Sequence, residues 1–227
     1  MKKVFFLLFA AVLVYVGCCN APQKETKNET VVPMELNSFE TIKLQAPDIE
    51  GGVALLKATQ ERKSYREFAE TNLSLKHLSE ILWMANGVNR EDGKRTVPSA
   101  RALYPLITYA VLANGIYLYD PVAHELQPVV EGDYRNITGR QPFVDNAPLN
   151  VVFIANYEVY EAANMPEDRW LYLASLDAGH CTQNIYLYCA SEGLKSVVRA
   201  GAQEKELLEA LNLDEKHQFI VAHTVGY

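Results

Sequence analysis

The segment from Arg169 to Glu192 constrains the fold more than any other part of this chain. It contains no proline, and Gly193 follows it as a helix stop signal. Apolar side chains occur around most of its helical circumference, at Leu171, Ala174, Ala178, Cys181, Ile185 and Cys189. The pattern predicts a long helix that lies in a core or at a subunit interface.

Strand signals lie on both sides of this segment. Asn114-Gly115 separates the apolar runs 107–112 and 116–119, which is the strongest short-range hairpin signal. Val151–Ala155 is a continuous apolar run, as expected for a strand buried on both faces. Three further short strands are expected at 126–130, 196–198 and 219–225.

Two shorter helices complete the predicted elements. Ser74 can cap a helix and Gly87 can end it, and the apolar side chains between them share one face: Leu75, Leu78, Leu82 and Ala85. Residues 204–211 form the other helix. Together the elements predict an α+β domain, with a mixed, mainly antiparallel sheet flanked by helices.

The first 18 residues resemble a bacterial lipoprotein signal peptide. Lys2 and Lys3 precede an apolar run, Val4–Val16, that is too short for a typical membrane span. The run leads into Gly17-Cys18, so Cys18 is the expected lipidation site; Cys19 is the alternative site, and an uncleaved anchor helix is the alternative for the segment. A lipid anchor would place the protein outside the cytoplasm, attached to a bacterial membrane.

Polar residues with two prolines fill 19–37 and predict a flexible tether. Residues 38–227 then suit a single domain with a sizeable core. The net charge of −7 argues against a nucleic-acid partner. Cys181 and Cys189 would be about 12 Å apart along one helix, too far for a disulfide, so buried free thiols are expected and no metal-ligand spacing surrounds them.

Two short stretches carry the chemistry. Arg62-Lys63-Ser64-Tyr65-Arg66 places three cations and a hydroxyl in five residues before the 75–85 helix, a suitable cradle for a phosphate and an electron-rich ring; a solvated basic turn is the alternative. Pro98-Ser99-Ala100-Arg101-Ala102-Leu103-Tyr104-Pro105 is a turn with small side chains, where a flat ligand could approach the backbone.

Together the two stretches resemble the flavin-binding signature of the nitroreductase family, and most closely its subgroup of thiazoline-forming dehydrogenases. The resemblance implies FMN as cofactor: Arg62 and Ser64 take the phosphate, Lys63 lines the ribityl chain, and Arg66 stabilises the reduced ring. It also implies a homodimer, in which Pro98, Ser99 and Ala100 contact the flavin of the partner subunit.

Further matches extend the resemblance along the folded part. Gln141 corresponds to an amide that reads the flavin pyrimidine, and Ala200 and Gly201 to a loop whose backbone faces the redox-active nitrogen. The long helix carries His180, which we interpret as a structural histidine. Two departures are Ala102, where the family often has asparagine, and the sequence end at Tyr227, before a basic residue that usually completes the phosphate site.

The predicted function is therefore that of an FMN-dependent oxidoreductase with ping-pong electron transfer between a donor and a small organic acceptor, or substrate dehydrogenation. NAD(P)H, a quinol or a redox protein could be the donor. Ala102 and the early end favour an alternative, a binding or structural lipoprotein on the same fold without flavin. A third possibility is a peptide modifier within a biosynthetic complex. Acidic pairs such as Glu91-Asp92 are interpreted as solvated faces.

Overall fold

The computed structural model describes residues 31–227, and residues 32–227 form one compact unit. The predicted signal peptide, Cys18, Cys19 and most of the predicted tether lie outside the described residues. Within the end of that tether, the Met34 N–H donates to Leu73 O at 2.9 Å, and Met34 and Leu36 pack against the core. Ordered packing therefore includes residues that precede the predicted boundary at 38.

A seven-stranded sheet forms the centre of the domain, with strand order β1-β4-β3-β2-β5-β7-β6. Its strands are β1 (Ile42–Lys43), β2 (Leu106–Leu112), β3 (Gly115–Asp120), β4 (Glu125–Glu131), β5 (Leu149–Asn156), β6 (Lys195–Arg199) and β7 (His217–Gly226). All six strand pairs described are antiparallel, so the predicted α+β class is confirmed and the sheet is antiparallel throughout these pairs.

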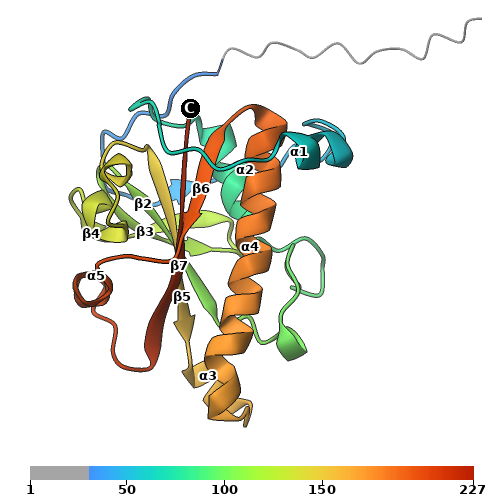
Figure 1. The fold of residues 1–227 in the computed structure, drawn as a ribbon, viewed down its shortest axis with the longest axis vertical. Helices are drawn as coiled ribbons and strands as arrows, with labels where there is room; N and C mark the ends of the chain where they lie inside the picture. The colour runs from blue at the N-terminus through green and yellow to red at the C-terminus, as the bar shows by residue number, and fades with distance from the viewer. Residues whose placement is uncertain (1–30) are drawn as a thin grey trace, which may run out of the picture. The chain divides into compact units, whose positions relative to one another are not determined.

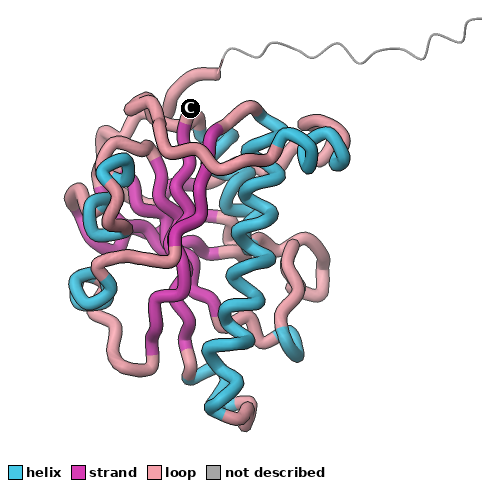
Figure 2. The backbone as a smooth tube through the Cα atoms, viewed as in Figure 1, coloured by secondary structure: helices cyan, strands magenta, loops and turns pink. Residues whose placement is uncertain are grey.

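Helices cover both faces of the sheet (Figures 1 and 2). They are α1 (Leu55–Glu61), α2 (Leu75–Asn86), α3 (Glu158–Ala162), α4 (Trp170–Glu192) and α5 (Glu204–Ala210), with short 3-10 turns η1 (Ala100–Ala102), η2 (Arg135–Thr138), η3 (Pro142–Val144) and η4 (Glu167–Arg169). One apolar cluster packs α2 and α4 against one sheet face. A second, smaller cluster packs α5 and η2 against the other face. None of the helices in the described part is long and apolar enough to cross a membrane.

The predicted helix signals act as expected at two ends and differently at a third. Ser74 Oγ accepts a hydrogen bond from the His77 N–H at 3.1 Å, and Gly193 ends α4 with a left-handed φ of 71°. Gly87 ends α2 in an extended conformation instead. Cys181 and Cys189 are buried free thiols on α4, as predicted.

The predicted hairpin is confirmed as β2–β3, but its turn lies one residue earlier than Asn114-Gly115. Gly115 is already the first residue of β3 and pairs with Leu112. A Cβ at Gly115 would lie 2.2 Å from the Phe39 ring, so the glycine permits close packing of that ring rather than a left-handed turn.

Candidate functional site

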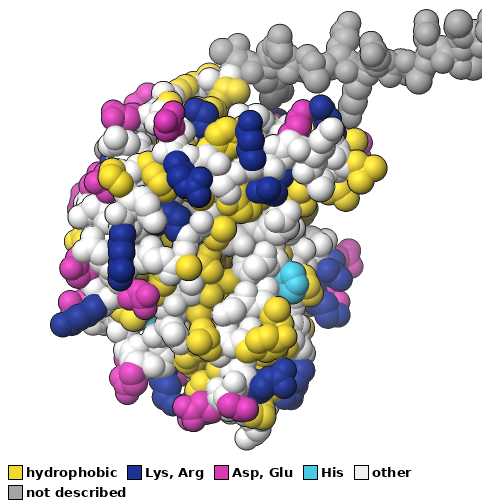
Figure 3. Space-filling view, in the orientation of Figure 1, with side chains coloured by type: hydrophobic (Ala, Val, Ile, Leu, Met, Phe, Trp, Pro, Cys, Tyr) yellow, Lys and Arg dark blue, Asp and Glu magenta, His cyan; other side chains and the backbone are white. Residues whose placement is uncertain are grey.

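The basic segment 62–66 follows α1 and lies along the free edge of the sheet. β6 is the last strand in the order, and the Tyr65 N–H donates to Ser196 O on that strand at 3.0 Å. Figure 3 shows Lys and Arg side chains gathered over this end of the molecule, above an apolar strip beside α4. A pocket of about 390 Å³ opens here, with Lys63, Tyr65, Tyr186 and Ser196 among its lining residues.

Tyr186 on α4 joins this segment to β6. Its hydroxyl lies 2.7 Å from Ser64 Oγ and accepts a hydrogen bond from the Val198 N–H at 3.0 Å. The Arg62 guanidinium carbon lies 5.2 Å from the centre of the same ring, a cation–π contact. The structure thus brings together the two predicted phosphate residues, Arg62 and Ser64. Sequence reasoning missed Tyr186, because one tyrosine on an apolar helix gives no separate signal.

The outer edge of β6 also presents unpaired backbone amides. Ser196 O and Val198 N both make outward contacts, and outward groups recur at every second residue of a strand, so the Ala200 amide faces the same side. Within residues 31–227, neither the Ala200 nor the Gly201 N–H has a hydrogen-bond acceptor. Free donors of this kind suit a ligand that lies along the edge.

The remaining basic residues of the segment point to solvent. Arg66 is exposed and forms no ion pair or hydrogen bond with the described residues, whereas Lys63 lies 5.0 Å from the centre of the Tyr65 ring. Arg62, Lys63 and the Ser64 hydroxyl lie near one end of β6, and the free amides lie at the other end. These are the donors that a flat mononucleotide requires. The residues present therefore fit the cofactor expected from the sequence.

The turn that contains Pro98, Ser99 and Ala100 contacts α4 at a different point along the helix from Ser64. Ser99 Oγ donates to Asp177 Oδ2 at 2.6 Å, and burial raises the pKa of that carboxyl. Asp177 and Tyr186 are nine positions apart, about 13 Å along the helix. Within one chain the structure therefore keeps this turn away from Arg62 and Ser64.

The same turn has an unusual backbone. Three non-glycine residues in it have left-handed φ angles: Arg101 at 54°, Ala102 at 55° and Tyr104 at 49°. The Ser99 hydroxyl accepts from the Tyr104 N–H at 3.0 Å, and Arg101 donates to Ala163 O at 2.9 Å. Asparagine adopts this conformation more readily than alanine, so Ala102 adds strain to the turn.

Gln141 is exposed, and its side-chain oxygen accepts a hydrogen bond from the Arg140 N–H at 3.2 Å. Its segment follows η2, whose last residue Thr138 is held by the buried Arg199 of β6. Gln141 therefore lies three residues after Thr138, which contacts Arg199 at the end of β6. Ala200 follows directly after Arg199. Arg199 is a second residue that the sequence analysis did not select.

Two histidines, His180 and His223, differ in their burial. His180 is exposed on α4 and has no hydrogen-bond partner within the described part of the chain, so its interpretation as a satisfied structural histidine is wrong. His223 on β7 is fully buried, and its ring centre lies 4.5 Å from that of Tyr186. Burial, and secondarily the charge of Arg199, lower the pKa of His223 to about 3. This imidazole is therefore neutral at physiological pH.

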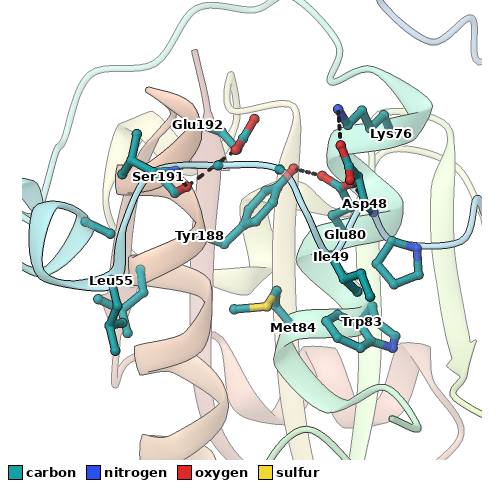
Figure 4. Close-up of a pocket in the computed structure, with 16 residues that line it drawn as sticks. Asp48, Ile49, Leu55, Lys76, Glu80, Trp83, Met84, Tyr188, Ser191 and Glu192 are labelled. Atoms are coloured by element: carbon teal, nitrogen blue, oxygen red, sulfur yellow. Dashed lines mark hydrogen bonds and ion pairs between the residues drawn. The ribbon is translucent and has the colours of Figure 1, made fainter. Parts of the chain in front are cut away.

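A separate pocket of about 300 Å³ lies between α2 and α4, beneath the loop that precedes α1 (Figure 4). Glu80 on α2 is 5% exposed, and its carboxylate accepts from the Tyr188 hydroxyl at 2.5 Å and from the Asp48 N–H at 2.9 Å. Burial, and then the negative charge of Glu80, raise the pKa of Glu192 on the opposite wall. The predicted cofactor residues do not line this pocket.

Comparison with known proteins gives a consistent family. The model of the nitroreductase family matches residues 59–227. A protein of Methanocaldococcus jannaschii described as a nitroreductase is 33% identical over 186 residues, which are 78% of this chain and 92% of that protein.

Solved structures agree with this result. A nitroreductase-type protein from Ralstonia eutropha is 40% identical, covers 88% of this chain and 95% of its own, and superposes with a TM-score of 0.78. The NADPH:FMN oxidoreductase of Vibrio harveyi shares the fold at 18% identity, with a TM-score of 0.56 over 76% of this chain and 68% of its own.

Proposed function

Because the chain belongs to the nitroreductase family of oxidoreductases, we propose that it binds FMN and transfers electrons from a reduced donor to a small organic acceptor. The observation that carries the proposal is the outer edge of β6, where the Arg62–Ser64–Tyr186 cluster and the free amide of Ala200 face one side, and the free amide of Gly201 follows next in the chain. When bound, FMN supplies reversible two-electron transfer, which allows donor and acceptor to react in turn.

The chain's own residues bind and orient this cofactor. Arg62 and Ser64 would hold the phosphate through charge-assisted hydrogen bonds, and Lys63 would line the ribityl chain. Arg66, which has no partner among residues 31–227, would face the pyrimidine ring and attract the negative charge that reduction adds. The Vibrio harveyi protein with the same fold is an NADPH:FMN oxidoreductase, which is a further reason to propose this cofactor.

The opposite end of the edge would contact the ring system. The backbone amides of Ala200 and Gly201 would donate to the redox-active side of the ring, and the Gln141 side chain would read its pyrimidine edge. Gln141 and Ala200 are exposed, so a ligand can reach both without displacing packed side chains. No side-chain nucleophile is required.

We further propose a homodimer in which Pro98, Ser99 and Ala100 complete the flavin site of the partner subunit. The separation of this turn from Arg62 within one chain agrees with that arrangement. An exposed apolar stripe on α4 supports it: Leu171, Tyr172 and Leu176 are 50%, 56% and 44% exposed. Light scattering of wild type and a Leu171→Glu, Leu176→Glu variant tests it, because only the variant should be monomeric.

The first test of the function is FMN titration of the purified protein, followed by flavin absorbance. Wild type should bind FMN, and Arg62→Ala with Ser64→Ala should weaken binding about a hundredfold, or about 2.7 kcal/mol. Lys43→Ala is the matched control, since this exposed cation of β1 pairs with Glu125 at the opposite edge of the sheet from β6. A wild type that binds no FMN at saturation would instead support a flavin-less binding lipoprotein.

Arg66 separates chemistry from folding. Arg66→Ala should lower the reduction potential of bound FMN and slow its reduction, while thermal unfolding stays unchanged because the side chain is exposed. An equal loss of folding stability would remove its assigned role.

We propose, from the sequence alone, that Cys18 is lipidated and that the enzyme works outside the cytoplasm. NAD(P)H is not expected there, so a quinol or a redox protein is the proposed donor, or the enzyme oxidises a substrate, as the likeness to thiazoline-forming dehydrogenases suggests. Labelling with a radioactive fatty acid should be lost in Cys18→Ala and retained in Cys19→Ala. The reverse result would move the attachment to Cys19.

A further inference from the structure

Arg199, the last residue of β6, is a buried cation that pairs with no acidic group in the described part of the chain. It is 5% exposed and makes hydrogen bonds to three segments. Its Nε donates to Thr224 Oγ1 at 2.9 Å, Nη1 to Thr138 O at 2.6 Å, and Nη2 to Asn150 Oδ1 at 2.9 Å and Thr138 Oγ1 at 3.5 Å. Each acceptor is uncharged.

The surroundings supply no counter-charge. Among residues 31–227, Arg199 forms no ion pair, and the nearby ring of His223 is neutral because its pKa is about 3. Burial lowers the pKa of Arg199 to about 10, which still leaves the guanidinium protonated at neutral pH. Buried charges in proteins are normally paired, so the unpaired charge of Arg199 would be stabilised further by a negative charge that arrives with a ligand.

The position of Arg199 connects two segments of the candidate site. On one side it precedes Ala200 and Gly201, whose amides are free. On the other it holds Thr138, which leads into Gly139–Gln141. A Cβ at Gly139 would lie 2.0 Å from Arg199 Nη1, so this position accommodates only glycine while the guanidinium stays in place.

We propose that Arg199 is a positioning residue that holds the Gly139–Gln141 segment beside the end of β6 and provides a fixed positive charge behind the flavin site. The inference rests on the proposed binding of FMN. Reduction by two electrons and one proton adds one negative charge to the cofactor. A desolvated cation near the ring attracts this charge more strongly than an exposed cation would, so reduced FMN binds more tightly than oxidised FMN.

The test compares the affinities of oxidised and reduced FMN, with dithionite as the reductant and a reference dye to read the potential. Arg199→Gln removes the charge and keeps a hydrogen-bonding amide, whereas Arg199→Lys keeps the charge. The glutamine variant should lose about tenfold in affinity for reduced relative to oxidised FMN, which lowers the two-electron potential by about 30 mV. The lysine variant should retain most of the ratio.

A second variant leaves Arg199 in place. Asn150→Asp puts a carboxylate where Oδ1 already accepts from Nη2, and it should lower the potential in the same direction as Arg199→Gln. This variant keeps the test valid if Arg199→Gln does not fold, which urea unfolding would show. Lys43→Gln removes an exposed cation from β1, at the opposite edge of the sheet, and should leave the potential unchanged.

Equal weakening of both redox forms in Arg199→Gln and Asn150→Asp would overturn the proposal and leave only a structural role. An unchanged potential in Asn150→Asp with normal FMN binding would also overturn it. Failure of the wild type to bind either form is a distinct outcome, because it removes the proposed function first and this inference with it.

Discussion

Arg199 and Glu80 are buried charges of opposite sign in layers on opposite faces of the sheet, and each is hydrogen-bonded only to uncharged groups. Both are 5% exposed. Arg199 is bonded to Thr138, Asn150 and Thr224, whereas Glu80 is bonded to the Tyr188 hydroxyl and the Asp48 amide. Neutral hydrogen bonds therefore offset part of the desolvation cost in both regions.

The two regions differ in what surrounds the charge. Near Glu80, Asp48 lies 4.0 Å from the Lys76 ammonium, and Glu192 has a raised pKa, so this region can lower its negative charge by itself. Near Arg199, the buried His223 stays neutral. The Arg199 region therefore retains its positive charge, and it adjoins the free amides that we assign to a ligand. The comparison is the reason that we propose a folding role for Glu80 and a binding role for Arg199.

The largest expected effect is in the Glu80 region. Glu80→Ala leaves the Tyr188 hydroxyl and the Asp48 amide without their acceptor and opens a cavity, so we expect a loss of about 3 kcal/mol in the free energy of unfolding. Glu80→Gln keeps an acceptor and should lose about 1 kcal/mol. Urea unfolding at neutral pH measures both. Equal losses would mean that the carboxylate charge matters more than its hydrogen bonds.

Packing around Arg199 gives the next effect. In Gly139→Ala the new methyl group would meet Arg199 Nη1 at 2.0 Å and Val144 Cγ1 at 2.8 Å, which should cost between about 2 and 3 kcal/mol. Gly179→Ala on α4 is the matched control, since its Cβ meets nothing within 4 Å and alanine favours helix. If both variants unfold at the same urea concentration, Arg199 is not rigidly held.

Local sequence signals predicted several elements and part of the candidate site. Apolar periodicity and caps predicted α2, α4 and the β2–β3 hairpin, because those signals are local. Arg62 and Ser64 were found together because they are close in the chain. Their contact with Tyr186 requires β6 to lie beside α4, which no local pattern encodes.

Buried polar groups were the hardest to predict. Arg199 follows a short apolar run and resembles the surface end of a strand, while His223 alternates with apolar residues like any strand position. Their burial depends on the order β5-β7-β6, which brings Asn150 and Thr224 beside Arg199. His180 shows the reverse error, because a helix with apolar residues on most sides still leaves one face exposed.

The buried His223 makes stability depend on pH. Lowering the pH from 6.5 to 5 should reduce the free energy of unfolding by about 2 kcal/mol. The folded-state pKa of His223 is about 3, below its unfolded value of 6.5, so the unfolded chain binds more protons in this window and stability falls as pH falls. His77, whose pKa burial also lowers, acts in the same direction. His223→Phe isolates the effect: its unfolding free energy should depend less on pH than that of the wild type, and parallel curves would contradict the assignment.

The smallest effect has the opposite sign and lies at Glu192. Burial and the charge of Glu80 raise its folded-state pKa, so its ionised form is disfavoured in the folded protein. The folded chain then binds more protons above the unfolded pKa of 4.5, and stability is lost as pH rises through the window between the two values. Glu192→Gln should therefore be more stable than wild type at pH 7, by less than about 1 kcal/mol because the group is half exposed, and should match it near pH 4. Urea unfolding at the two pH values measures the difference.

A Glu192→Gln variant that is less stable than wild type at pH 7 would contradict this prediction. It would show that the folded protein stabilises the ionised Glu192 carboxylate, so that the Glu80 region, like the Arg199 region, keeps its full charge.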